Sequence, residues 1–150
     1  MSLYGEARQA DVDAPPEACY AALTDFERVP DWQGSVRSAT VLERDAQGRG
    51  TVVEFEVDAK VRTVRYRIRQ LHDPPHRLGS EYLGGDFRDF SGEWRFEPLP
   101  GGRTRVHLNL AIDPDRLVPG PVRRLIAEAV MGRALADLKA HVEAPPGRAS

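Results

Sequence analysis

The chain has 150 residues, enough for one domain with a single well-buried core. Its apolar fraction of 41% and charged fraction of 29% are ordinary for a water-soluble globular protein. The net charge of −2 gives no electrostatic basis for binding nucleic acid or an anionic membrane, so we expect neither partner.

Cysteine usage and the N-terminus narrow the class of protein further. Cys19 is the only cysteine, so the chain can form neither an internal disulfide nor a cysteine metal cluster. No apolar run approaches the roughly 20 residues that span a bilayer, and we expect no stable membrane insertion. Residues 1–6 lack the basic and apolar segments of a signal peptide, which favours a cytoplasmic location. The expected single domain, residues 1–150, has a core over about 4–143 and a disordered tail over 144–150.

The N-terminal segment predicts one strand followed by two short helices. Residues 4–12 show the weak alternation of a strand. Residues 13–17 resemble a helix start, with an aspartate, two prolines and a glutamate in the positions that the first turn favours. A second short helix is predicted within 26–32, with a break near Val29, because the residue before Pro30 disfavours helical angles. Trp32 follows in a loop, where it either closes the end of the core or lines a cavity.

The middle of the chain predicts strands at hairpin spacing. Their ranges are 36–44, 52–58, 61–71, 77–83, 87–97 and 103–112, separated by turns rich in glycine and proline. Strands joined by such short connections pair antiparallel, so we expect a meander.

The C-terminal part changes to a helical period. Apolar residues recur at helical spacing over 119–143, and prolines at 119 and 121 suit a helix entrance. A helix with one apolar stripe must pack on an apolar surface, and the sheet is the partner at hand. The predicted fold class is α+β: a curved antiparallel sheet of about seven strands wrapped around one long C-terminal helix.

The hairpin over 52–71 has a predicted register if its loop is Ala59-Lys60. Its inward pairs are then Val53–Tyr66, Phe55–Val64 and Val57–Arg62. On the solvent side, Glu54 then faces Arg65 and Glu56 faces Thr63. A slip of one residue would turn Arg62 outward.

Few residues have side chains placed to take part in catalysis or to bind a metal ion. None of His72, His76, His107 and His141 has a second ligand at a metal-binding spacing, so we expect no metal and no cofactor. No nucleophile elbow and no phosphate loop occurs. The inward-facing groups able to act as acid, base or cation are Tyr66, Tyr82 and Arg62, a small set for a catalyst.

Several segments together resemble the START-like, helix-grip superfamily. They are residues 12–17 at the strand-to-helix entrance, 23–32 through the helix and Trp32, and 92–98 with 102–106 in the late hairpin. The chain is most similar to the polyketide cyclase/dehydrase and lipid-transport group, which includes coenzyme-Q-binding proteins. The resemblance covers about 4–143.

The resemblance implies an apolar cavity between the sheet and the long helix. The implied lining is Trp32, Phe55, Val64, Tyr66, Tyr82, Phe90, Trp94, Leu108, Ile126 and Val130. Trp32 becomes a gate or wall of this cavity. Binding there would come mainly from burial of apolar surface, with a few polar groups setting orientation.

Three functions stay open at this point. The first is a carrier or sensor of a small hydrophobic molecule such as a quinone, a lipid or a polyketide-like compound. The second is a polyketide aromatase/cyclase or dehydrase. The third is a protein-interaction module, as in ribosome-associated relatives, which the near-neutral charge disfavours. The sequence does not decide whether two chains pair as a homodimer.

Overall fold

The computed structural model describes residues 4–59, 62–113, 120–131 and 133–144. Within these residues one antiparallel sheet has the strand order β1-β7-β6-β5-β4-β3-β2. The strands are β1 Tyr4–Val12, β2 Val36–Arg44, β3 Gly50–Asp58, β4 Thr63–Asp73, β5 Arg77–Gly85, β6 Asp89–Leu99 and β7 Arg103–Asp113. The six strands after β1 form the predicted meander, each bounded within two residues of its predicted ends. β1 pairs with β7 at the far edge.

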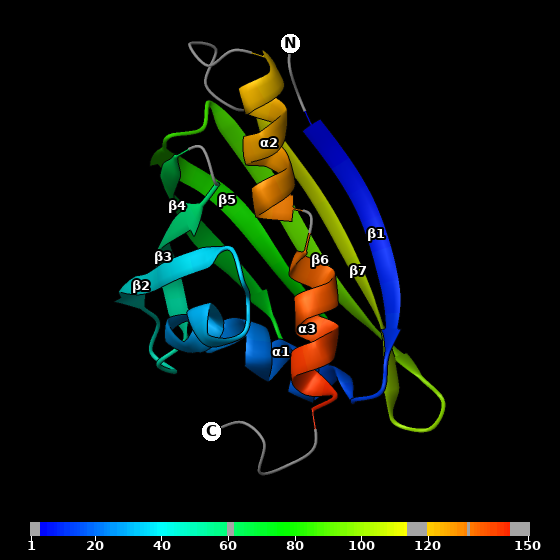
Figure 1. The fold of residues 1–150 in the computed structure, drawn as a ribbon. Coiled ribbons are helices and arrows are strands. Elements are labelled where there is room, and N and C mark those ends of the chain that lie inside the picture. The colour runs from blue at the N-terminus through cyan, green and yellow to red at the C-terminus, as the bar shows by residue number, and fades with distance from the viewer. Residues whose placement is uncertain (1–3, 60–61, 114–119, 132, 145–150) are drawn as a thin grey trace.

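The described helices lie on the concave side of the curved sheet (Figure 1). They are α1 Pro16–Thr24, the 3₁₀ helix η1 Phe26–Asp31, α2 Gly120–Met131 and α3 Ala134–Val142. The two prolines before Glu17 stand at the N-cap and the first turn of α1, where a missing backbone N–H costs nothing. Cys19 is fully buried on the inner side of α1, as a small apolar residue would be. η1 contains Pro30, which suits a tight, short helix better than an extended α-helix.

The prediction of one long C-terminal helix is wrong. The helical segment is divided into α2 and α3, and Arg133 forms a turn at the N-cap of α3. The sequence carries a glycine at 132, which disfavours a helix interior by about 1 kcal/mol relative to alanine. The division lets each helix serve a different apolar cluster. Ile126 of α2 packs in the cluster that holds Ile68, whereas Leu138 of α3 packs in the cluster that holds Cys19.

The predicted register of the β3–β4 hairpin is wrong by two residues. Phe55 lies opposite Tyr66, and Val57 lies opposite Val64. The loop is longer than predicted, since the backbone N–H of Ala59 donates to the carbonyl of Arg62 at 2.9 Å. A shift of two preserves the face of every residue paired within the strands, because side chains alternate with period 2.

The outer face of this hairpin is solvated, as predicted, although its ion pairs are displaced by the same two residues. Arg65 pairs with Glu56 at 2.8 Å, and Arg67 pairs with Glu54 at 2.9 Å. These exposed pairs contribute little to stability, at most about 1 kcal/mol each. These ion pairs show which face of β4 is exposed to water.

Two adjacent glycines at the end of β5 give a matched test of the fold. Gly84 and Gly85 have φ angles of 138° and 139°, a region that side chains disfavour. A Cβ at Gly84 would meet nothing within 4 Å, whereas one at Gly85 would lie 2.4 Å from the carbonyl oxygen of Arg65.

We therefore predict unequal costs for the two alanine substitutions. Gly84→Ala should lower the free energy of unfolding by about 1–3 kcal/mol, through backbone strain alone. Gly85→Ala should cost more than about 3 kcal/mol, because the β4 backbone must also move. Urea denaturation of both variants measures the difference, and equal losses would contradict the close packing of β5 on β4.

Candidate functional site

A cavity lies on the concave side of the sheet where the apolar clusters meet. The cavity has a volume of about 90 Å³. Together with its opening to solvent, the hollow measures about 750 Å³. Its lining comes from every strand except β1 and from α1, η1 and α3: Leu23, Phe26, Val29, Gln33, Ser35, Val36, Phe55, Val57, Tyr66, Ile68, Gln70, Leu78, Ser80, Phe90, Gly92, Trp94, Leu110 and Ala134. The unoccupied room holds several water molecules, so a larger guest requires lining side chains to shift.

An aromatic group surrounds Tyr66 at one side of the cavity. Its ring centroid lies 5.6 Å from that of Phe55, 5.2 Å from that of Phe90 and 5.1 Å from that of Phe87. Such close ring pairs each add about 0.5–1.5 kcal/mol beyond burial. They also fix the Tyr66 ring, since it has neighbours on several sides.

The Tyr66 hydroxyl is the notable polar group of this wall. The residue is 6% exposed, and in the described part of the chain its hydroxyl makes no hydrogen bond. Burial raises the pKa of Tyr66 far above its usual value, so the hydroxyl keeps its proton and can donate it in a hydrogen bond. An unsatisfied buried hydroxyl costs about 1–3 kcal/mol, which a bound acceptor would recover.

Tyr82 differs from Tyr66 in both position and partner. Its hydroxyl donates to the backbone carbonyl of Phe87 at 2.7 Å, and it does not line the cavity. Burial raises the pKa of Tyr82 to about 12. Its hydroxyl therefore fixes the β5–β6 turn rather than facing a guest.

Arg62 does not face the interior as the predicted register required. It is exposed, and its guanidinium lies 3.9 Å from the carboxylate of Asp86 at the surface. The corrected register explains this position, because the hairpin loop includes Arg62 and no strand partner orients it inward.

Of the ten residues implied as cavity lining, four line the cavity, five do not, and the side chain of one lies outside the described residues. Phe55, Tyr66, Phe90 and Trp94 do line the cavity. Val64 and Ile126 are buried in the cluster around Tyr66, and Leu108 is buried in the cluster of α1 and α3. Tyr82 and Trp32 pack against these clusters without lining the cavity. The side chain of Val130 lies outside the described residues.

Trp32 holds the loop beside the cavity against α3. Its ring stacks on that of His141, with centroids 5.0 Å apart and planes 7° from parallel. Two residues on, the backbone N–H of Gly34 donates to the Asp137 carboxylate at 3.1 Å. Gln33 and Ser35, which line the cavity, belong to this same loop. Trp32 is thus a positioning residue of the wall rather than part of its inner surface.

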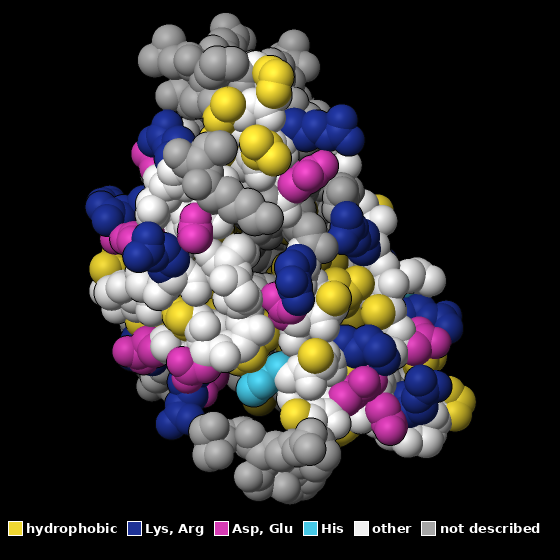
Figure 2. Space-filling view, viewed as in Figure 1, with side chains coloured by type: hydrophobic (Ala, Val, Ile, Leu, Met, Phe, Trp, Pro, Cys, Tyr) yellow, Lys and Arg dark blue, Asp and Glu magenta, His cyan; other side chains and the backbone are white. Residues whose placement is uncertain are grey.

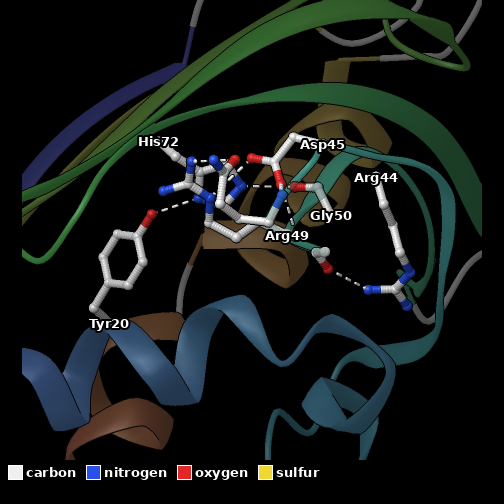
Figure 3. Close-up of polar contacts among 8 residues, drawn as sticks. Tyr20, Arg44, Asp45, Arg49, Gly50 and His72 are labelled. Atoms are coloured by element: carbon white, nitrogen blue, oxygen red, sulfur yellow. Dashed lines mark hydrogen bonds and ion pairs between the residues drawn. The ribbon is translucent and has the colours of Figure 1, made fainter.

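A polar chain fastens α1 to the sheet next to the cavity (Figure 3). The Nε2–H of His72 donates to the carbonyl of Gly50 at 2.7 Å, and the Nδ1 atom accepts from the Tyr20 hydroxyl. This tautomer follows because a carbonyl oxygen can only accept. The ring of Phe26, a cavity residue, packs edge-on against that of His72 at 6.4 Å. The chain positions the α1–η1 corner that forms one wall.

Four polar residues that were not expected to do so line the cavity, namely Gln33, Ser35, Gln70 and Ser80, and the last two lie on the sheet. Gln70 is 7% exposed and belongs to the inward series of β4 with Tyr66 and Ile68. A polar residue in the buried phase of an alternating strand was the available signal. Ser80 lies directly opposite Gln70 on β5. Like Tyr66, neither side chain makes a hydrogen bond within the described residues.

The cavity wall has no ionisable carboxylate, lysine, arginine or histidine among its described residues. None of the described lining residues carries a charge. Figure 2 shows basic and acidic side chains interspersed on the helix side, with no large patch of one sign on that face. Among the described residues, no group of three His, Cys, Asp or Glu side chains is placed to hold a metal ion. The described helices are all too short or too polar to cross a membrane.

A curved antiparallel sheet of this topology, with helices on its concave side and an apolar cavity between them, is the START-like fold. Solved structures agree: a START superfamily protein from Mycobacterium smegmatis has a TM-score of 0.81 at 20% identity, covering 93% of this chain and 97% of that one. The Zhui aromatase/cyclase from Streptomyces sp. R1128 has a TM-score of 0.80 at 20% identity, covering 95% and 94%. At this identity the likeness shows the fold.

The family follows from sequence. Residues 12–139 match the family described as polyketide cyclase / dehydrase and lipid transport, so the chain belongs to that family and the predicted resemblance is confirmed. The granaticin polyketide synthase bifunctional cyclase/dehydratase of Streptomyces violaceoruber is 36% identical over 102 residues. The match covers 65% of this chain and 30% of that protein, so the chain spans about a third of its relative's length.

The Trp32–His141 stack predicts a measurable energetic coupling. In a double-mutant cycle of Trp32→Leu and His141→Leu, we expect a coupling of about 0.5–1.5 kcal/mol in the free energy of unfolding. A cycle between Trp32→Leu and Leu42→Ala serves as control and should give additive effects, because Leu42 is exposed and does not belong to the clusters against which Trp32 packs. Additivity of Trp32 with His141 would contradict the stack as a stabilising contact.

Proposed function

We propose that the protein binds a small, mainly hydrophobic molecule with at least one oxygen acceptor, of the quinone or polyketide type, in the cavity on the concave side of the sheet. The observation that carries this proposal is the buried Tyr66 hydroxyl without a hydrogen-bond partner in the described chain. The rings around it supply apolar contact, and the hydroxyl supplies one directed bond. A purely aliphatic guest would leave that hydroxyl unsatisfied.

The surroundings of Tyr66 support an aromatic or conjugated guest over a flexible chain. Phe55, Phe90 and Trp94 offer ring faces or edges to the cavity. Flat molecules gain from such ring contacts and lose little conformational entropy on binding. The family's description, which includes both polyketide chemistry and lipid transport, is compatible with this class of ligand.

We predict that the wild-type protein binds anthraquinone, which has two carbonyl oxygens, more tightly than anthracene, which has the same shape and none. Tyr66→Phe should weaken anthraquinone binding by about 3- to 10-fold, the effect of one hydrogen bond, and leave anthracene binding unchanged. Quenching of tryptophan fluorescence measures both affinities, because Trp94 lines the cavity.

Tyr82→Phe is the matched control. It removes a half-buried hydroxyl whose partner is the Phe87 carbonyl, so stability should fall while the anthraquinone preference stays the same. Loss of that preference in Tyr82→Phe but not in Tyr66→Phe would contradict the assignment. Failure of both compounds to bind would overturn the proposed function itself.

A second candidate function is a polyketide cyclase or dehydratase. The observation in its favour is the 36% identity with a bifunctional cyclase/dehydratase. In such a reaction an enol carbon attacks a ketone of the same chain and water is then lost, so catalysis can come from folding the chain and stabilising developing negative charge on oxygen. Tyr66 is the residue we assign to that oxygen, as a neutral hydrogen-bond donor. No described lining residue supplies an ionised base, which favours the binding function as the primary proposal.

The catalytic alternative makes a separate prediction. With a reactive poly-β-ketone thioester as substrate, the wild-type protein should accelerate ring closure, and Tyr66→Phe should reduce that rate by about 10²-fold. Product analysis by chromatography and mass spectrometry measures it. Arg62→Ala serves as the control and should retain the full rate, because Arg62 is on the surface. No acceleration by the wild-type protein would reject catalysis while leaving binding intact.

A further inference from the structure

A row of four residues crosses the concave face of the sheet at the level of Gln70. Gln70 on β4 lies opposite Ser80 on β5, Ser80 lies opposite Gly92 on β6, and Gly92 lies opposite Leu110 on β7. All four line the cavity. The row therefore presents an amide, a hydroxyl, a position without a side chain and an aliphatic group, in that order.

The amide of Gln70 is buried without a partner. The residue is 7% exposed, and in the described part of the chain its side chain makes no hydrogen bond, even to the adjacent Ser80. A glutamine amide offers two donors and one acceptor, and leaving them unmade in the interior is unfavourable. The same is true of the half-buried Ser80 hydroxyl. The two groups lie side by side, so one ligand group can satisfy both.

Gly92 makes room for the Leu110 side chain beside this pair. A Cβ there would come within 2.6 Å of Leu110 Cδ2, so even alanine would force the leucine to move. The backbone at Gly92 does not require glycine, since its φ lies outside the left-handed region. The absence of a side chain is therefore explained by the close approach of Leu110, and the cavity wall next to Ser80 is formed by a glycine and this leucine.

Tyr66 and Gln70 stand four residues apart on β4, with their side chains on the same face. At about 3.3 Å per residue their Cα atoms are about 13 Å apart. Ile68 lies between them and makes the intervening floor apolar. The cavity thus has two separate polar positions with an apolar stretch between.

We propose that Gln70 and Ser80 form a second polar subsite that receives an oxygen function at the far end of the ligand from Tyr66. The ligand class is then an elongated, rigid molecule of two or three rings, apolar in the middle and oxygenated at both ends. This inference rests on the proposed function, since it assigns the other end of the same ligand. A fatty acid or a molecule with a single polar end leaves one of the two positions unsatisfied.

The test compares 2,6-dihydroxyanthraquinone, oxygenated at both ends, with 2-hydroxyanthraquinone, which lacks one terminal hydroxyl. Their central carbonyls are the same, so the ratio of affinities isolates the second hydroxyl. Isothermal titration calorimetry of the wild-type protein should give a ratio of at least about 10 in favour of the dihydroxy compound. The double variant Gln70→Met/Ser80→Ala should reduce that ratio to about 1–2.

Gln9→Met is the matched control. Gln9 is an exposed residue of β1 that does not line the cavity, and the same substitution there should leave the ratio at its wild-type value. A urea unfolding curve of Gln70→Met separates binding from structure. Methionine has similar length and removes an unsatisfied amide, so the midpoint should be unchanged or higher.

The outcomes separate the two proposals. If both compounds bind and Tyr66→Phe weakens both, but the ratio is near 1 or survives the double variant, the second subsite is overturned and the proposed function stands. If the double variant binds the dihydroxy compound more tightly, the row holds only water and the inference is likewise overturned. If neither compound binds, the proposed function fails and the inference fails with it.

Discussion

Alternation along β4 is the constraint on which the site depends. Its inward residues are Val64, Tyr66, Ile68 and Gln70, and its outward arginines pair with glutamates in water. The strand lies near the middle of the sheet, so its inner face looks directly at the helices. Apolar burial and solvation of the arginines both enforce one orientation, because turning the strand over would bury three charges. The same alternation that fixes the fold therefore places two polar groups inside it.

Much of the fold could be predicted because its signals are local. Strand limits follow from period-2 alternation and from turns, and these agree with the structure within two residues. The β3–β4 register was missed because loop length, unlike alternation, leaves little trace in composition. The predicted register was wrong by two residues, an even number, so the inward and outward faces of the paired residues were predicted correctly. Only the loop residue Arg62 lies on a different side from the one predicted. Helical periodicity predicted the apolar stripe of the C-terminal segment but not its division into α2 and α3.

The candidate site was less accessible to prediction than the fold. Large aromatic residues were the main candidates for the cavity lining, and four of them do line the cavity. Trp32 was expected to line the cavity, but its ring stacks on His141 instead, a contact between residues more than a hundred positions apart that no local pattern predicts. Gln70 was not predicted as a lining residue, because a single polar residue at a buried position of a strand is a weaker sequence signal than an aromatic residue. A polar residue at a position that the burial pattern reserves for apolar ones gives a fold that serves many functions its specificity for one kind of ligand.

The buried cysteine of α1 has a consequence for studying how the cavity opens. Cys19 is the sole thiol of the chain and is fully enclosed beneath α1, and burial raises the pKa of the thiol. A thiol reagent can reach it only when α1 separates from its neighbours, and α1 carries Leu23 at the cavity wall. The rate at which Cys19 is labelled in the native protein therefore reports how often α1 separates from its neighbours, and no probe has to be introduced. Slower labelling in the presence of a guest would indicate that occupancy holds the α1 corner closed.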